Sequence, residues 1–272
     1  MLFRVVEAGD LRLETYQILE VSSRWSRPGL TLPGSVRIDP SFVEAANQTN
    51  RYFPRYHCAQ DAQLLPPREL AGALASLGLT SQRPVLVTGT GPYAPVNVGR
   101  VAWALFSAGF AEVAWLNGGS SGWRGARPIA PSALGSRGAE LRGPCNATAT
   151  DLRHVLLFDV RSRAEYSGQR ADRYRFFQSR GHIPGALWLG DWTQLVTPQR
   201  RLQERNHLQE RWQRAGVRSD RDLVFYCGTG WRSSLACCVA LWLGYTRVRN
   251  YDGGIYDWIS RGFPTQECGA PS

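Results

Sequence analysis

The sequence predicts an α/β fold made of two tandem domains, each a mostly parallel sheet flanked by helices on both faces. An internal repeat carries this prediction, because residues 85–91 read VLVTGTG and residues 224–230 read VFYCGTG. In both copies a short apolar run, typical of a buried strand, enters a glycine-rich turn. A helical segment follows each turn and ends at a glycine, and another apolar strand comes next. Alternating strands and helices form parallel sheets that are covered on both faces.

The repeat extends upstream of the turns and sets the expected domain boundaries. Residues 157–161 (LFDVR) resemble residues 18–22 (ILEVS), and residues 181–186 (GHIPGA) resemble residues 30–35 (LTLPGS). A stretch rich in Pro, Ser and Gly, from about residue 128 to 150, separates the two copies. The expected organisation is a first domain at residues 1–130, a linker at 131–150 and a second domain at 151–272.

The composition is typical of a soluble globular protein, because 43% of the 272 residues are hydrophobic and 20% are charged. No apolar run approaches the roughly 18 residues of a membrane span, so no membrane partner is expected. The first residues lack a basic segment followed by a sustained apolar stretch, so no signal peptide is visible. We therefore expect a cytoplasmic protein; a periplasmic one would follow if a leader had been removed.

The formal net charge is +10, and all 32 basic residues are arginines. The absence of lysine excludes a lysine Schiff base and a P-loop lysine. Guanidinium groups bind planar anions through paired hydrogen bonds, so this charge favours small anionic substrates. The arginines form no dense tract of the kind that binds nucleic acid, and no nucleic-acid partner is expected.

The six cysteines form no C-x-x-C pair and no zinc pattern with histidine, and they are too sparse for a disulfide framework. No metal site is therefore expected. Cys237 and Cys238 fall inside an apolar helical pattern, which predicts packing in the core. Cys58, Cys145 and Cys268 have no supporting context and receive no role.

The remaining cysteine, Cys227, stands where the second predicted strand-turn-helix carries its turn. The loop after it consists of Gly228, Thr229, Gly230, Trp231 and Arg232. Glycines let successive backbone N–H groups point into one concavity that binds anions, and the start of the next helix adds partial positive charge. Arg232 adds a fixed cation. These features stabilise a thiolate, so Cys227 is expected to be nucleophilic near neutral pH. A cysteine that merely packs would need neither the glycine turn nor the arginine.

Four motifs occur in one order in the second half: FDVRSRAEY, GHIPGA, YCGTGWRS and YDGGIYDW. Together they resemble the rhodanese family of sulfurtransferases. The first half resembles a degenerate, inactive copy of the same domain, with Thr88 in the place of the cysteine. The loop CGTGWR is similar to that of bacterial multidomain thiosulfate sulfurtransferases and differs from the CGSGVT loop of mercaptopyruvate enzymes.

The resemblance implies a two-step sulfur transfer with thiosulfate favoured over 3-mercaptopyruvate. The Cys227 thiolate would take the outer sulfur of the donor and become a persulfide, with the loop at residues 228–232 binding the donor. An acceptor would then remove the sulfur: cyanide in an assay, a thiol in the cell or a sulfur-accepting protein. Asp159 would support the loop or cap the strand end. No metal or organic cofactor is implied.

One position departs from the family pattern. Tandem members often have a substrate-binding arginine four residues after the D-x-R motif, and here Glu165 stands there. This leaves the role to Arg173 or Arg175 further along the loop, with Arg175 as our candidate.

Several other polar or aromatic residues receive structural interpretations. His182 lies in a G-H-I-P-G turn and is expected to be structural rather than a general base. Trp231 would line the mouth of the pocket or cover the domain interface. Ser233 and Ser234 are expected to cap free N–H groups of the helix, and Trp258 to lie in the core.

Two other functions remain open at this point. A cysteine-dependent phosphatase would use a C-x5-R loop, but Cys227 and Arg232 form a shorter C-x4-R loop that fits a sulfur atom better than a phosphate. A non-catalytic persulfide carrier or binding module would keep the same loop and pass sulfur to a protein partner.

Overall fold

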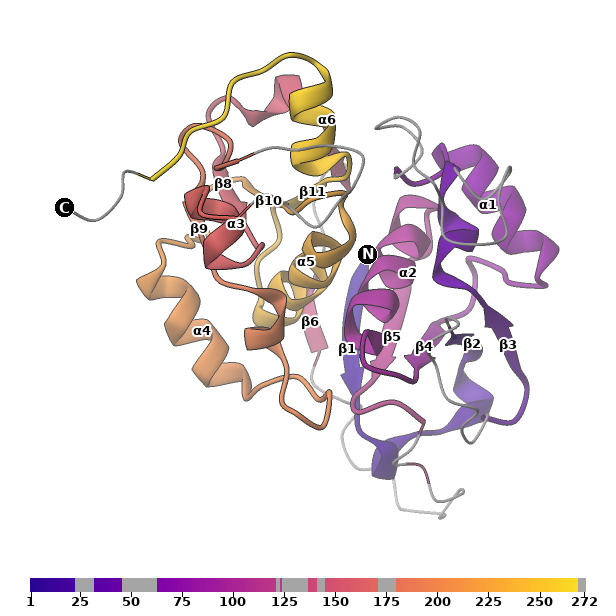
Figure 1. The fold of residues 1–272 in the computed structure, drawn as a ribbon. Coiled ribbons are helices and arrows are strands. Elements are labelled where there is room, and N and C mark those ends of the chain that lie inside the picture. Colours follow the sequence, from indigo (N-terminus) through magenta and orange to yellow (C-terminus); the bar gives the residue numbers. More distant parts are fainter. Residues whose placement is uncertain are drawn as a thin grey trace.

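The chain folds into two α/β halves that lie side by side (Figure 1). The computed structural model describes residues 1–22, 32–45, 63–120, 123, 137–140, 145–170 and 180–268. The first half contains a six-stranded sheet and the second half a five-stranded sheet. Nearly all strand pairings are parallel, so the predicted fold class is confirmed.

The first sheet has the strand order β3-β2-β4-β5-β1-β6, and β6 alone among these described strands runs antiparallel to its neighbour. The strands are β1 (Leu2–Val6), β2 (Gln17–Val21), β3 (Ser35–Ile38), β4 (Val85–Gly89), β5 (Glu112–Leu116) and β6 (Arg137–Glu140). One face is covered by α1 (Pro67–Ser76) and α2 (Ala94–Ser107).

The other face of the first sheet is covered differently from the prediction. In the described part of the chain it packs against Leu11 and Tyr16, which belong to the connection from β1 to β2. That connection contains two short 3-10 helices, η1 (Ala8–Asp10) and η2 (Leu13–Thr15), and a third, η3 (Pro40–Val43), follows β3.

The second sheet has the strand order β7-β11-β10-β8-β9. Its strands are β7 (Asn146–Ala147), β8 (Leu156–Asp159), β9 (Leu187–Trp188), β10 (Leu223–Tyr226) and β11 (Val248–Tyr251). Its helices are α3 (Arg163–Ser167), α4 (Arg205–Arg214), α5 (Trp231–Leu243) and α6 (Gly254–Ser260), with the 3-10 helices η7 (Ala149–Leu152) and η8 (Trp192–Leu195). Helices α4 and α5 pack on one face and α6 on the other.

The central strand β10 shows why both faces of this sheet are buried. Leu223 and Phe225 point into the core shared with α5, whereas Val224 and Tyr226 point into the cluster under α6. All four side chains are at most 1% exposed. A parallel strand between two helical layers therefore has apolar side chains at every position, which is why residues 223–226 form a continuous apolar run in the sequence.

The segment expected to be a linker, residues 131–150, contributes to both sheets instead. Strand β6 pairs with β1 in the first sheet, and β7 pairs with β11 in the second. The boundary between the sheets thus lies between residues 140 and 146. Pro, Ser and Gly predicted a loop there, but of these residue types only Gly138 falls within the two short edge strands.

The two halves meet along α2 and α5, which lie side by side between the sheets (Figure 1). A Cβ atom at Gly99 would lie 2.6 Å from Leu235 Cα, so only glycine allows the two helices to come this close. Cys238 Sγ lies 3.8 Å from the Gly99 carbonyl oxygen at the same contact. Cys237 and Cys238 are both 0% exposed, which confirms their predicted place in the core, and burial raises the pKa of each thiol.

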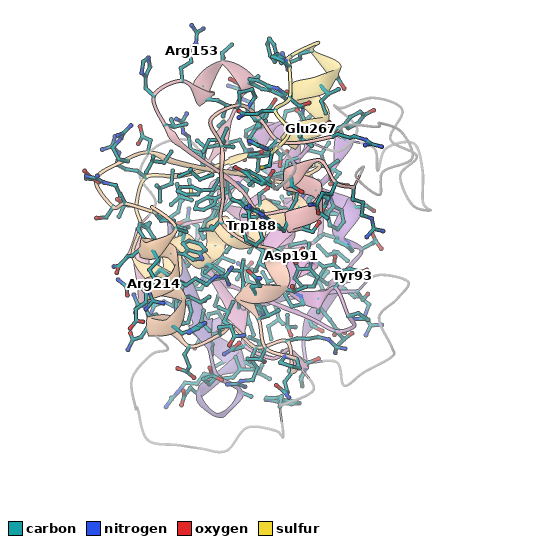
Figure 2. The ribbon with its side chains drawn as sticks, turned by 60° about the vertical axis from the view of Figure 1, so that its left-hand side comes forward. Tyr93, Arg153, Trp188, Asp191, Arg214 and Glu267 are labelled. Carbon is teal, nitrogen blue, oxygen red and sulfur yellow. The ribbon has the colours of Figure 1, made fainter. Side chains whose placement is uncertain are left out.

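The halves also meet at the surface through aromatic side chains. The ring of Tyr93, in the turn before α2, lies 6.1 Å from the ring of Trp192 on η8. Figure 2 shows Tyr93, Asp191 and Trp188 along this face of the molecule. The interface between the halves therefore runs from the core to the surface.

Gly99→Ala should destabilise the protein. The added methyl group would press on the backbone of Leu235, and overpacking of this kind costs about 1–3 kcal/mol of unfolding free energy. Urea unfolding measures the loss. Gly72→Ala is the control, because Gly72 lies in α1 with open space around it and alanine there should stabilise by about 0.5–1 kcal/mol. Equal stability of Gly99→Ala and the wild type would contradict the close contact.

Candidate active site

Cys227 lies directly after β10 and is 0% exposed. The loop that follows it is bonded to the start of α6. The carbonyl oxygens of Cys227 and Gly228 accept hydrogen bonds from the N–H groups of Ile255 at 2.9 Å and Tyr256 at 3.1 Å. Gly254 makes this possible, because it has φ +58° and a Cβ there would lie 2.6 Å from the Cys227 carbonyl oxygen.

Gly230 forms the second tight contact of the loop, at the N-terminus of α5. It has φ +82°, and a Cβ there would overlap the carbonyl oxygen of Asp252. Asn250 Nδ2 donates to the Gly230 carbonyl oxygen at 3.2 Å, and Ser234 Oγ donates to the same oxygen at 2.7 Å. Residues 250–256, which include the double glycine, thus contact the loop at both of its ends.

The serine hydroxyls at the start of α5 do not have the expected role. The N-terminus of α5 has no side-chain cap, and Ser234 bonds a carbonyl oxygen rather than a free N–H group. Ser233 Oγ lies 3.6 Å from Cys227 Sγ, and both side chains are fully buried. Ser233 is therefore a site residue that the sequence did not reveal, since a serine in the first helical turn also fits a cap.

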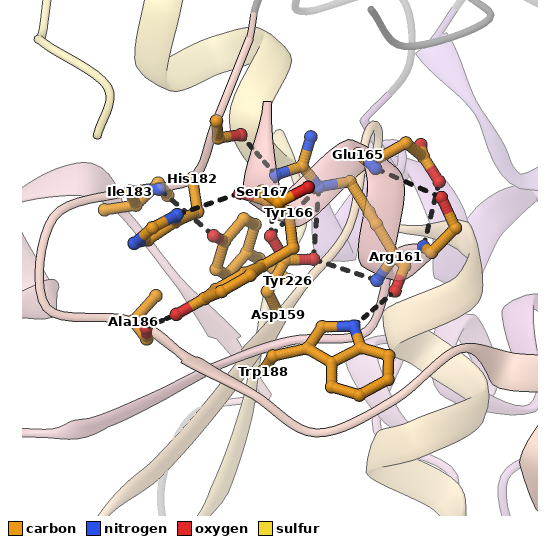
Figure 3. A network of polar contacts seen from close by, with 12 residues as sticks. Asp159, Arg161, Glu165, Tyr166, Ser167, His182, Ile183, Ala186, Trp188 and Tyr226 are labelled. Carbon is orange, nitrogen blue, oxygen red and sulfur yellow. Dashed lines mark hydrogen bonds and ion pairs between the residues drawn. The ribbon is translucent and has the colours of Figure 1, made fainter. Parts of the chain in front are cut away.

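Arg232 is paired with Glu165, the residue that departs from the family pattern. Their bidentate ion pair has N–O distances of 2.9 and 3.0 Å, and the side chains are 16% and 8% exposed. Glu165 also accepts from the N–H of Ser162 at 2.9 Å, which completes a capping box at the start of α3 (Figure 3). The cation of the loop is therefore neutralised by a carboxylate that α3 holds in place.

Asp159 bonds the turn after β8 rather than the residues that follow Cys227. It accepts from Arg161 Nη2 at 2.6 Å and from the Arg161 N–H at 2.8 Å, and Arg161 Nη2 also donates to the Gly181 carbonyl oxygen (Figure 3). Of its two predicted roles, these bonds favour the role at the strand end. Burial, with the Asp159 charge adding to it, raises the pKa of Tyr226 well above its usual value.

His182 has the contacts of a structural residue. Its Nδ1 lies 2.9 Å from the Tyr166 carbonyl oxygen, its ring stacks on Tyr166 at 3.9 Å, and it is 4% exposed (Figure 3). Trp258 is only partly buried, although the sequence predicted a core residue; its Nε1 donates to the Pro264 carbonyl oxygen at 2.8 Å. Arg173 and Arg175 lie outside the described residues.

The register of the strands shows which residues of the two glycine turns are equivalent. Glu20 and Asp159 are equivalent in the repeat. Glu20 pairs with Thr88 across β2 and β4, whereas Asp159 pairs with Tyr226 across β8 and β10. Thr88 therefore has the place of Tyr226, which precedes the cysteine.

The double glycines support the same shift. A Cβ at Gly119 would overlap the carbonyl oxygen of Gly89, just as a Cβ at Gly254 would meet that of Cys227. Gly89 rather than Thr88 thus corresponds to Cys227, and this corrects the earlier alignment by one residue. The first half therefore has no side chain at the position that Cys227 holds in the second half.

A buried charge cluster, defined as Glu44, Arg100 and Asp252, joins the first half to the loop. Arg100 on α2 contacts Glu44 at 3.1 Å and forms a short ion pair with Asp252. Trp231 Nε1 donates to Glu44, so this loop residue lies at the interface between the halves. Burial raises the pKa of Glu44 to about 8, although the Arg100 charge opposes the shift.

The described residues contain no group of three or more His, Cys, Asp or Glu side chains that could hold a metal ion. Among the described helices, none is both long and apolar enough to span a membrane.

Comparison of the sequence with known protein families identifies the domain that carries the Cys227 loop. Residues 140–261 match the rhodanese-like domain. This half of the chain therefore contains a rhodanese-like domain, and it is similar in sequence to sulfurtransferases.

Two curated relatives are thiosulfate sulfurtransferases. The one from Azotobacter vinelandii is 31% identical over 171 residues, covering 59% of this chain and 61% of the relative. The YnjE thiosulfate sulfurtransferase of Escherichia coli K12 is 27% identical over 265 residues, covering 88% of this chain and 57% of the relative. The chain thus spans about three fifths of the length of these relatives.

Among solved structures, EanB in complex with ergothioneine is similar in fold. The TM-score is 0.76 at 22% identity, and the match covers 99% of this chain and 71% of EanB. Both halves therefore share one arrangement with that protein.

Replacing Glu44 by glutamine should flatten the pH dependence of stability. The pKa of Glu44 is about 8 in the folded protein, against a usual 4.5. Between these values the folded state holds a proton that the unfolded chain has released, so the free energy of unfolding falls as pH rises towards about 8. Urea unfolding at both ends of this window measures the fall.

The matched control for this substitution is Glu69→Gln, which removes an exposed carboxylate in the first turn of α1. It should keep the wild-type dependence on pH. If Glu44→Gln lost as much stability over the same window as the wild type, Glu44 would not be the group that holds the proton.

Proposed function

We propose that the protein transfers sulfane sulfur from a donor such as thiosulfate to a thiophilic acceptor through a persulfide on Cys227. The observation that carries the proposal is the Cys227 loop, whose carbonyl oxygens are bonded to α6 while α5 begins a few residues later. The thiosulfate sulfurtransferases among the relatives support the choice of donor. The second half is the catalytic domain in this proposal, and the first half is an inactive one.

The first step forms the persulfide. The Cys227 thiolate attacks the outer sulfur of thiosulfate, the sulfur–sulfur bond of the donor breaks, and its electron pair leaves with sulfite. The transferring sulfur carries negative charge, which the N–H groups of the loop and the N-terminus of α5 stabilise. Ser233 Oγ, 3.6 Å from Cys227 Sγ, donates a hydrogen bond to the cysteine sulfur.

The second step regenerates the thiolate. A thiolate or cyanide acceptor attacks the outer sulfur of the persulfide, and the sulfur–sulfur bond at Cys227 breaks with its electron pair returning to Cys227. No net oxidation occurs, because one sulfane sulfur moves between two nucleophiles. The acceptor in the cell is a thiol or a sulfur-accepting protein in this proposal.

Incubation with thiosulfate should add about 32 Da, one sulfur atom, to the intact mass of the protein. The adduct should map to Cys227, disappear on addition of cyanide with release of thiocyanate, and be absent in Cys227→Ser. Cys268→Ser is the control and should keep the adduct, because Cys268 is partly exposed but lies outside the loop.

The same measurement separates the other functions. A stable adduct with little thiocyanate would favour a persulfide carrier that awaits a protein partner. Absence of an adduct with both thiosulfate and 3-mercaptopyruvate, together with hydrolysis of an aryl phosphate, would replace the proposal by a phosphatase.

Glu165→Gln should lower the KM for thiosulfate by about three- to tenfold, because Arg232 would lose a charged competitor for the anionic donor. Glutamine also completes a capping box, so α3 should keep its N-terminal hydrogen bonds. Glu210→Gln is the matched control; it breaks an exposed ion pair with Arg214 on α4 and should leave the KM unchanged. Equal KM values in the two variants would contradict the role of Glu165.

A further inference from the structure

Helix α2 of the first half reaches the segment that holds the Cys227 loop through the buried side chain of Arg100. Arg100 is 0% exposed, and its guanidinium bridges two acid side chains, Glu44 and Asp252. Glu44 belongs to the first half, whereas Asp252 follows β11 of the second half. The positive charge of Arg100 therefore lies between an acid from each half.

Asp252 is the residue against which the loop is packed. Its carbonyl oxygen fills the space where Gly230 would carry a Cβ. Its side chain accepts from Asn250 Nδ2 at 3.0 Å, and Asn250 Nδ2 also donates to the Gly230 carbonyl oxygen at 3.2 Å. The other carboxylate oxygen accepts from the N–H of Leu64, in the first half, at 2.6 Å. A change in Asp252 would thus be transmitted directly to Gly230.

Trp231 provides a second connection between the loop and the same cluster. Its Nε1 donates to Glu44, and the Arg100 guanidinium lies 6.0 Å from the centre of its indole ring. Two successive loop residues, Gly230 and Trp231, are therefore held by the two acids that Arg100 joins.

We infer that Arg100 is a positioning residue for the Cys227 loop, supplied by the first half of the chain. The inference rests on the proposed sulfur transfer, in which the loop must hold the transferring sulfur. Without Arg100 the buried acids would lose the cation that compensates them, and removal of one partner from a buried ion pair is strongly unfavourable. The loop would then shift, and misplacement of reacting groups by about 1 Å can cost about a hundredfold in rate.

Substitution of Trp103 serves as a control, because it weakens the interface between the two halves at a place away from the Cys227 loop. Trp103 lies one turn further along α2, is 0% exposed, and donates its Nε1–H to Asn146 Oδ1 at 2.9 Å. Asn146 lies in β7 rather than in the loop. Trp103→Phe therefore removes a partly buried polar contact between the halves without changing a residue of the charge cluster.

The test compares wild type, Arg100→Met, Arg100→Lys and Trp103→Phe. Each protein is mixed with saturating thiosulfate and quenched, and the fraction of Cys227 persulfide is followed by intact mass; KM is measured separately by thiocyanate release. Arg100→Met should lower the maximal rate of persulfide formation by about ten- to a hundredfold with little change in KM. Arg100→Lys should restore part of the rate. Trp103→Phe should lower the Tm. At temperatures below that Tm, it should form the persulfide at the wild-type rate.

Each other outcome has a defined meaning. If both Arg100 variants form persulfide at the wild-type rate, or if Trp103→Phe slows the step as much as Arg100→Met, the positioning role is wrong. If Arg100→Met does not fold, Arg100→Lys decides, and an unchanged rate in that variant overturns the inference. If the wild type itself forms no persulfide with thiosulfate or 3-mercaptopyruvate, the proposed function fails, and the positioning role falls with it.

Discussion

The pair of hydrogen bonds from the start of α6 to the Cys227 and Gly228 carbonyl oxygens is the constraint on which the site depends. A trans peptide unit points its N–H opposite to its C=O. With both carbonyl oxygens fixed on α6, the N–H groups of Gly228 and Thr229 must point away from that helix. The direction of these N–H groups, on which the proposed binding of an anion depends, is therefore set by a contact with a neighbouring segment. Gly254 is required because a side chain there would meet both carbonyl oxygens.

The same reasoning extends to the first half of the chain. It lacks a side chain at the position of the nucleophile, since Gly89 corresponds to Cys227 in the strand register. Yet α2 packs on α5 as closely as Gly99 and Leu235 permit, and Arg100 places a buried cation beside Asp252. In the proposed sulfur transfer this half therefore supplies no nucleophile, and its contribution is the positioning of the loop through these contacts.

Sequence analysis predicted what depends on local pattern and missed what depends on distant pairing. The repeat predicted the two sheets, and the glycine turn indicated Cys227 as the candidate nucleophile, because strand, turn and helix signals are local. Register is not local: a shift of one residue moves every side chain to the other face, and only strand pairing shows that Thr88 aligns with Tyr226. The short edge strand β6 was not predicted either, because it forms only by pairing with β1, which is distant in the sequence. Ser233 and Arg100 were missed because their partners lie in other elements.

The pairing of Arg232 with Glu165 changes how charge acts at the site. The sequence carries a net charge of +10, which suggested a bias towards anionic substrates. At the loop, however, the nearest fixed cation is already paired with a buried carboxylate, and Arg100 contacts the acid side chains of Glu44 and Asp252. Surface charge acts only over about a Debye length and is screened by salt. If the proposed anionic donor binds at Cys227, its selectivity would therefore come mainly from backbone N–H groups and the start of α5 rather than from these two arginines.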